Sequence, residues 1–280
     1  MILVAQGWPV VGEPPGRLGR KRAVGWTVSD GRATGLRVTL LGEFAVTWES
    51  SRLKLDRCTQ RLTAFLALRN CWVRRAVTAV ALWPDADPDQ GRAALRSALA
   101  RLRRVDAPPL LEEARDLIRL HPAVAVDARE VFQLARRVLD HASLGDRAAL
   151  ETLCARGDLL PEWFDEWVVL DREQLRELRL HALEMASTLL TAQGRMAEAA
   201  QAALAAVQAE PLRESAARAL VKVHLAEGNW GLAITRYRAY CQVIRQELGL
   251  DPSPQMRTLF DHLWPPAERP LAALAAARAG

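Results

Sequence analysis

The spacing of hydrophobic residues changes twice along this 280-residue chain and restricts its fold more than any other feature. From Leu36 to Trp48 large apolar side chains alternate with other residues, which is the period of β-strands. We therefore predict short antiparallel strands over 36–55, with Gly42 marking a bend or bulge. From residue 58 onward most apolar residues follow a helical period, apart from a short stretch over 109–120. The chain thus combines an N-terminal part that contains strands with a helical remainder.

The helices and strands predicted after the first strands follow one another in the order of a known motif. By period and by turn residues we predict helices over 58–69, 74–83 and 88–105, then strands over 109–113 and 116–120 on either side of a turn at Ala114 and Arg115. Strands, three helices and a closing hairpin are the order of a winged helix-turn-helix. We expect residues 36–127 to form this α+β domain.

The remainder of the chain carries a repeat. Gly194 and Gly228 are 34 residues apart, and Ala199 and Ala233 share this offset. This is the period of the tetratricopeptide (TPR) helix pair. Two prolines, Pro211 and Pro252, stand where helices are expected to end. We therefore expect an all-α, TPR-like helical-repeat domain over 128–264, followed by a tail over 265–280.

The helix predicted over 88–105 has a complete start signal and an unusual charge. Asp87 is placed to cap it, Pro88 suits its first position and Gln90 fits a capping box. Five Arg and no acidic residue lie between Gly91 and Arg104. The apolar stripe predicted from the helical period is Leu95, Ala98, Leu99 and Leu102.

The opposite face of this helix has small residues at its centre and Arg on its flanks, a composition that suits close entry into a DNA major groove. We predict base contacts by Arg96 and Ser97. The residues predicted to contact phosphates are Arg92, Arg101, Arg103 and Arg104. Arg115, at the hairpin tip, is predicted to enter the adjacent minor groove. The alternative is a solvated basic face on an ordinary amphipathic helix.

Charge is distributed in keeping with a nucleic-acid partner. Residues 1–35 carry five basic and two acidic side chains, residues 36–127 fifteen and eleven, and the remainder eighteen and twenty. The positive charge therefore lies in the first half, where an acidic polymer would bind. Residues 1–35, rich in Gly and Pro, are expected to be a disordered basic tail; an arm that adds phosphate contacts is the alternative.

Several runs resemble the Streptomyces antibiotic regulatory protein (SARP) family. Two runs are similar to its bacterial transcriptional activator domain: GDLLPEWFDEWVVLDREQLRELR from Gly157 and ELGLDPSPQMRTLF from Glu247. Upstream, LRVTLLGEFAV, QRLTAFLAL, ALWPD and RAALRSALARLRR resemble the OmpR-type winged helix fused to that domain in the family. The resemblance covers roughly residues 36–262 in the same order.

The resemblance implies a sequence-specific regulator, usually an activator, that binds double-stranded DNA at repeated sites near promoters and contacts RNA polymerase. Binding at repeated sites is consistent with a homodimer. The helix from Pro88 to Val105 would be the recognition helix, the hairpin around Arg115 the wing, and the loop Pro84 to Asp87 a polymerase contact. The hairpin sequence EEARDLIRL departs from the family because it lacks the usual Gly-Tyr pair, which weakens the minor-groove assignment.

Other functional classes find little support in the sequence. It contains no GxxxxGK[ST] phosphate loop and no HExxH motif, and the EWFDEW carboxylates are expected to cap or pair at the entrance of the helical domain while Trp163 and Trp167 pack in the core. We predict neither enzyme activity nor a metal or other cofactor. The competing hypothesis is a TPR-like interaction scaffold whose winged helix binds protein and not DNA.

The cellular setting follows from what the sequence contains. The four Cys lie far apart without metal-ligand spacing and are expected to be reduced thiols. No stretch approaches the roughly 20 apolar residues that a membrane span needs. We expect a cytoplasmic protein that does not contact a membrane.

Overall fold

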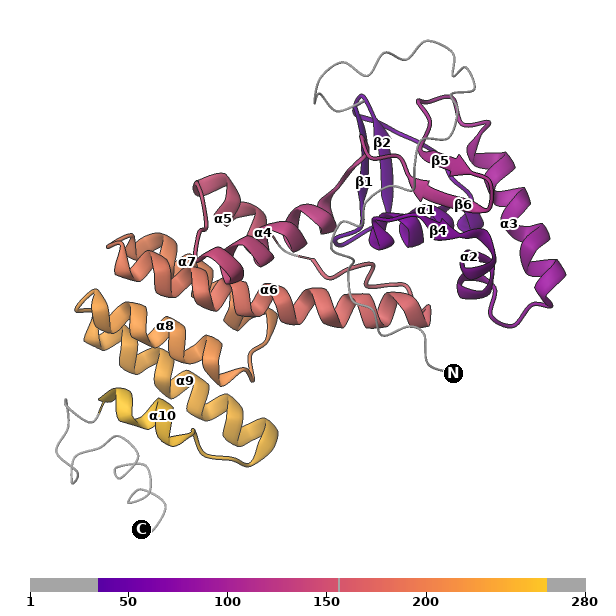
Figure 1. Cartoon of the computed structure of the whole chain (residues 1–280). Coiled ribbons are helices and arrows are strands. Elements are labelled where there is room, and N and C mark those ends of the chain that lie inside the picture. The colour runs from indigo at the N-terminus through magenta and orange to yellow at the C-terminus, as the bar shows by residue number, and fades with distance from the viewer. Residues whose placement is uncertain (1–34, 156, 261–280) are drawn as a thin grey trace. The chain divides into compact units, whose positions relative to one another are not determined.

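The computed structural model describes residues 35–155 and 157–260, which form two compact units (Figure 1). The first unit contains the described residues up to 133 together with those of 156–177. The second contains 134–155 and the described residues from 178 onward. The basic tail expected over 1–35, Gly35 aside, and the C-terminal tail expected over 265–280 lie outside the described residues.

The first unit begins with the strands that the alternation predicts. In β1, Leu36 and Val38 are buried whereas Arg37 is exposed. Gly42, with a φ of 83°, turns the chain between the first two strands. The sheet has the order β3-β2-β1-β7, antiparallel except for the parallel pair β1 and β7. Its strands are β1 (Leu36–Thr39), β2 (Ala45–Trp48), β3 (Ser51–Arg52) and β7 (Ala125–Val126).

Three helices follow at the positions predicted, with shifted ends. They are α1 (Arg57–Arg69), α2 (Arg75–Leu82) and α3 (Pro88–Leu102). The Asp56 carboxylate caps α1 by accepting hydrogen bonds from the backbone N–H groups of Cys58 and Thr59. Thr59 and every residue from Leu62 to Leu68 are buried, so α1 is the central helix of the first core.

A second, three-stranded sheet completes the winged-helix order. Strands β5 (Leu111–Ala114) and β6 (Leu117–Leu120) form an antiparallel hairpin, and β4 (Val73–Arg74) pairs with β6. The hairpin turns at Arg115 and Asp116, where Arg115 has a φ of 53°. The wing is therefore present despite its departure from the family sequence.

The second unit is helical. Figure 1 shows α7, α8 and α9 lying side by side. The helices after β7 are α4 (Asp127–His141), α5 (Arg147–Cys154), α6 (Glu166–Ala192), α7 (Met196–Ala209), α8 (Glu214–Ala226), α9 (Trp230–Leu248) and α10 (Pro254–Arg257), with a closing 3₁₀ turn, η1 (Thr258–Phe260). The boundary between the units falls inside α4 and inside α6.

The 34-residue offset corresponds to a real structural repeat. Gly194 precedes α7 with a φ of 75°, and Gly228 precedes α9 with a φ of 76°. Ala199 and Ala233 are both fully buried on the helices that follow. Equivalent residues therefore adopt equivalent backbone and packing positions, as a TPR-like repeat requires.

The EWFDEW run packs in the first unit. Trp163 stacks on Phe44 with ring centroids 5.5 Å apart, and Trp167 meets Phe65 edge-on at 5.4 Å. Both Trp side chains are buried, as predicted. The carboxylate of Asp165 pairs with Arg61 of α1, so it joins two segments of the first unit. An independent backbone link is the hydrogen bond from the N–H of Leu160 to the carbonyl of Leu40, at 2.8 Å.

Candidate nucleic-acid interface

Helix α3 begins where predicted and ends earlier. The Asp87 carboxylate accepts a 2.8 Å hydrogen bond from the backbone N–H of Asp89, so Asp87 is the N-cap. The helix ends at Leu102 and not at Val105. The N–H of Arg104 instead reaches the carbonyl of Arg101, and that of Val105 the carbonyl of Leu102, so the chain tightens into 3₁₀-type turns after the last helical residue.

The two faces of α3 match the predicted pattern. Its buried residues are Gly91, Leu95, Ala98, Leu99 and Leu102, which include the whole predicted apolar stripe. Ser97 on the opposite face is exposed, and Ala93 and Ala100 are partly buried. Small side chains therefore line the middle of the outward face, and the Arg residues flank them.

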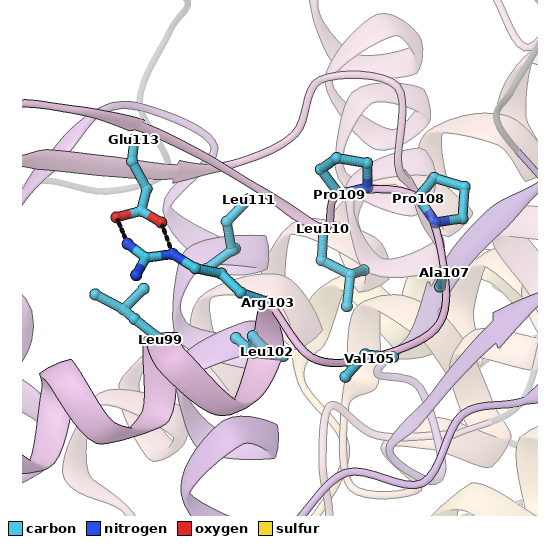
Figure 2. A pocket seen from close by; sticks show the side chains of 10 residues that line it. All are labelled: Leu99, Leu102, Arg103, Val105, Ala107, Pro108, Pro109, Leu110, Leu111 and Glu113. Atoms are coloured by element: carbon cyan, nitrogen blue, oxygen red, sulfur yellow. Dashed lines mark hydrogen bonds and ion pairs between the residues drawn. The ribbon is translucent and has the colours of Figure 1, made fainter. Parts of the chain in front are cut away.

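One flank of α3 is fixed to the wing. Figure 2 shows the Arg103 guanidinium facing the Glu113 carboxylate of β5, with two hydrogen bonds of 2.8 and 2.6 Å. Glu113 also pairs with Arg75 of α2. Burial alone would raise the pKa of Glu113, but hydrogen bonds and charge from Arg103 and Arg75 outweigh burial and lower its pKa. A single carboxylate thus joins three elements of the motif.

The Arg103–Glu113 pair borders a small pocket. The pocket has a volume of about 170 Å³ and lies among the end of α3, the loop to β5 and β5 itself. Its other lining residues, drawn in Figure 2, are all apolar: Leu99, Leu102, Val105, Ala107, Pro108, Pro109, Leu110 and Leu111.

The other flank of α3 faces the start of α1. Arg101 pairs with Asp56 at 3.1 Å. Burial would raise the pKa of Asp56, but hydrogen bonds from Thr59, the charge of Arg101 and a hydrogen bond from Cys58 lower it. Arg101 and Arg103 are therefore held in place by carboxylates on opposite sides of the helix.

The remaining predicted contact residues are accessible. Arg92 pairs with Asp89 within the first turns of α3. Arg96, Arg104 and the hairpin residue Arg115 are exposed, and within the described ranges their side chains make no ion pair or hydrogen bond. The predicted Arg residues thus fall into two groups, those that form ion pairs with carboxylates and those that form none among the described residues. The sequence did not indicate this difference.

Two further cations were not predicted. Arg52 and Lys54 line a cleft of about 410 Å³ together with Arg101 and Arg104. They lie about fifty residues upstream of Arg101 and Arg104 and in no periodic pattern with them, so no signal in the sequence connects them to the helix.

The described residues contain few features of other site types. Among them no group of three or more His, Cys, Asp or Glu could hold a metal ion. All four Cys are free thiols in this part of the chain. None of the helices described is long and apolar enough to cross a membrane.

Comparison with known proteins identifies the second half of the chain. Residues 133–263 match the bacterial transcriptional activator domain. The regulatory protein AfsR of Streptomyces coelicolor is 29% identical over 279 residues, which cover 94% of this chain and 27% of that protein. AfsR of Streptomyces griseus is 27% identical over 237 residues, covering 81% of this chain and 24% of that protein. The chain is therefore similar to the AfsR regulators and contains a bacterial transcriptional activator domain in its second half.

The matched domain and relatives are those of regulators and not of a class of enzymes, which confirms the prediction that the chain is not an enzyme. It spans about a quarter of the length of the curated relatives it matches.

A solved structure supports the fold. The structure of Mycobacterium tuberculosis EmbR in complex with a low-affinity phosphopeptide matches with a TM-score of 0.62 and 24% identity, covering 88% of this chain and 70% of that one. This likeness confirms the predicted fold class, a winged helix-turn-helix followed by an all-α, TPR-like domain.

Proposed function

We propose that this protein is a SARP-type, sequence-specific DNA-binding transcription regulator, acting as an activator, with α3 as its recognition helix. The observation that carries the proposal is the outward face of α3. Small residues occupy its centre, Arg residues lie on both flanks, and no acidic residue follows Asp89 within the helix. Such a face lets the backbone approach the groove floor while guanidinium groups reach base edges or phosphates.

The proposed roles follow from where each side chain is held. Arg96 and Ser97, exposed and near the middle of α3, would contact base edges. The residues proposed to contact phosphates are Arg92, Arg101, Arg103 and Arg104. Arg115, unengaged at the hairpin tip, would enter the minor groove. Carboxylates already orient Arg101 and Arg103, which lowers the entropy lost when they bind a phosphate.

The proposal includes a division of the chain and its partners. Residues 36–127 would bind DNA, and residues 128–264 would serve as the activator domain. The loop Pro84 to Asp87 would contact RNA polymerase. Because the Asp87 carboxylate caps α3, the exposed carboxylate that the loop would offer to the polymerase is that of Asp85. Two copies would bind repeated sites as a homodimer in the cytoplasm.

The direct test is a titration of the full chain with labelled duplex DNA. A preferred sequence would first be selected from a random duplex library, and affinity would then be measured at several salt concentrations. We expect affinity to fall steeply with salt because phosphate contacts release counterions. Absent or salt-independent binding would overturn the proposal.

Two substitutions separate sequence reading from backbone contact. Arg96→Ala should cost about 1–3 kcal/mol on the selected duplex and little on random DNA, relaxing sequence preference. Arg104→Ala should weaken binding to both duplexes alike and reduce the salt slope by about one. Arg147→Ala is a matched control because Arg147 lies on α5, outside the proposed interface. The assigned roles would be reversed if Arg104→Ala, and not Arg96→Ala, relaxed the preference.

A second function has one observation in its favour. Val77 and Val80, one turn apart on α2, are 53% and 65% exposed. An apolar pair on the surface suits a protein partner, as the scaffold hypothesis requires. Paired substitutions Val77→Ser and Val80→Ser that abolish partner capture, in a chain that does not bind DNA, would favour this alternative.

A further inference from the structure

A polar cleft in the first unit brings Arg101 and Arg104, proposed above as phosphate contacts, together with Arg52 and Lys54, to which no role has been assigned. It has a volume of about 410 Å³ and lies between the end of α3 and the segment that joins β3 to α1. Its charged lining residues are Arg52, Lys54, Asp56, Arg101, Arg104 and Asp106. The four cations and two carboxylates leave the lining with an excess of positive charge.

Ion pairing decides which of these cations is available. Arg101 pairs with Asp56 at 3.1 Å, and Arg52 pairs with Glu43 at 3.2 Å. Arg52 also donates a 2.9 Å hydrogen bond to the carbonyl of Phe44, which holds it in place. Lys54 and Arg104 are exposed and, within the described residues, have no carboxylate partner. These two cations provide the uncompensated charge of the cleft.

The cleft adjoins the outward face of α3. Counting 100° per residue, Ser97 and Arg101 lie on one side of that face, whereas Arg96 and Arg103 lie on the other. The wing approaches the side of Arg103 through Glu113. The cleft lies on the side of Arg101, so α3 is flanked by the wing on one side and by the cleft on the other.

We propose that this cleft binds a backbone phosphate of duplex DNA, with Lys54 and Arg104 as its cationic contacts. The inference rests on the proposed function. A guanidinium can donate two hydrogen bonds to one phosphate, and an ammonium adds a mobile point charge on a long stem. Asp106, the lining carboxylate that is not paired with Arg101, offsets part of the positive charge of Lys54 and Arg104. Lys54 thereby extends the DNA contact beyond the helix-turn-helix to the segment before α1.

The experiment compares Lys54→Gln with Lys222→Gln in the full chain. Lys222 lies exposed on α8, so its neutralisation changes net charge equally but outside the cleft. On the selected duplex, Lys54→Gln should reduce the magnitude of the salt slope by about 0.9, which is about an eightfold loss of affinity at 0.1 M salt. Sequence preference should be unchanged, and Lys222→Gln should leave both quantities at the wild-type values.

The other possible outcomes would overturn either the cleft assignment alone or the proposed function with it. An unchanged slope in Lys54→Gln, with a wild-type chain that binds DNA, overturns only the cleft assignment. A relaxed sequence preference in Lys54→Gln shows base contact and also overturns it. Thermal stabilisation by inorganic phosphate over chloride at equal ionic strength, lost in Lys54→Gln, would identify a small-anion site instead. A wild-type chain that binds no duplex overturns the proposed function and this inference together.

Discussion

Glu113 is the residue on which the geometry of the candidate interface most depends. It links Arg103 at the end of α3 to Arg75 at the start of α2 while lying on the wing strand itself. Its lowered pKa means that its ionised form is stabilised in the folded protein. The carboxylate therefore contributes to the stability of the whole motif, although no base or phosphate contact is assigned to it.

Replacing this carboxylate should loosen the wing. We expect Glu113→Gln to lower the free energy of unfolding by about 1 kcal/mol, the net contribution of a typical hydrogen bond. Because the folded pKa lies below the ordinary value of 4.5, the wild-type contribution is present above pH 4.5 and lost as pH falls through the lowered pKa. Urea unfolding between pH 3 and pH 7 should therefore show convergence of the two proteins at the acid end.

A parallel loss at every pH would contradict this explanation, since the difference would then not depend on ionisation of Glu113. Glu112→Gln is a suitable control: Glu112 is the neighbouring strand residue, and it pairs with Arg119 on β6 and not with α3.

Asp171 is a buried carboxylate whose charge is balanced by one partner, Arg69. Its side chain is only 6% exposed, and burial raises its pKa although the charge and hydrogen bond of Arg69 oppose that shift. Arg69→Met should lower stability by about 3–5 kcal/mol at pH 7, because an uncompensated carboxylate remains buried. Thermal or urea unfolding measures this loss. It should shrink at lower pH, where Asp171 takes up a proton.

The double variant Arg69→Met/Asp171→Asn provides the matching control, since it removes both charges. It should recover much of the lost stability. No recovery would mean that the Arg69 side chain acts through its packing over the Phe65 ring, 5.0 Å away, and not through its charge.

At the scale of elements, Gly194 and Gly228 permit a quantitative test of the repeat. Both have a positive φ, and a Cβ built on either would meet no atom within 4 Å. Gly194→Ala and Gly228→Ala should therefore each cost about 1–2 kcal/mol from the left-handed backbone alone, and by similar amounts. Gly231→Ala, in equally open space but on helix α9, should instead stabilise the protein by about 0.4–1 kcal/mol. Denaturant unfolding of the three variants would reveal unequal costs if the two turns were not equivalent.

The sequence predicted the order of helices and strands because each depends on the spacing of its hydrophobic residues and on the residues that cap or turn its ends. Asp87, the α3 stripe and the hairpin turn are all determined by neighbours within a few residues. The exposed side of α2 was less predictable: Thr78, Ala79 and Leu82 are buried, whereas Val77 and Val80 face outward. A short helix offers two overlapping apolar stripes, and only tertiary packing selects between them.

In the candidate site, too, the sequence predicted only what depends on residues close together in the chain. The Arg residues of α3 follow from one helix, but the ion pairs that hold some of them do not. Asp56 and Lys54 approach the end of α3 only through the tertiary fold, and Glu113 pairs with Arg103 across the wing. Contacts between segments distant in sequence carry no periodic signal.

At the scale of the whole molecule, the first unit needs residues that follow the winged helix by some thirty positions. Trp163, Trp167 and Asp165 pack on or pair with its sheet and α1. We expect a fragment ending at Gln133 to lack a cooperative unfolding transition, although it contains all three helices and the wing. Urea unfolding followed by circular dichroism tests this directly. A cooperative transition at the wild-type midpoint would show that the later segment is dispensable.

The substitution Trp167→Ala in the full chain gives the same test without truncation. Loss of a large buried aromatic side chain should cost about 3–5 kcal/mol. The full chain with Phe164→Ala is the control, since Phe164 lies in the same run but is 83% exposed.

The return of residues 157–177 to the first unit has a practical consequence for building chimeric regulators. An exchange of DNA specificity between relatives would ordinarily transplant a single continuous segment such as 36–127. In this protein that graft would pair a foreign α1 and sheet with the resident Trp163, Trp167, Asp165 and Asp171, which were selected to fit other neighbours. A working hybrid would have to transplant two separate stretches of chain, the second taken from inside the region matched as the activator domain.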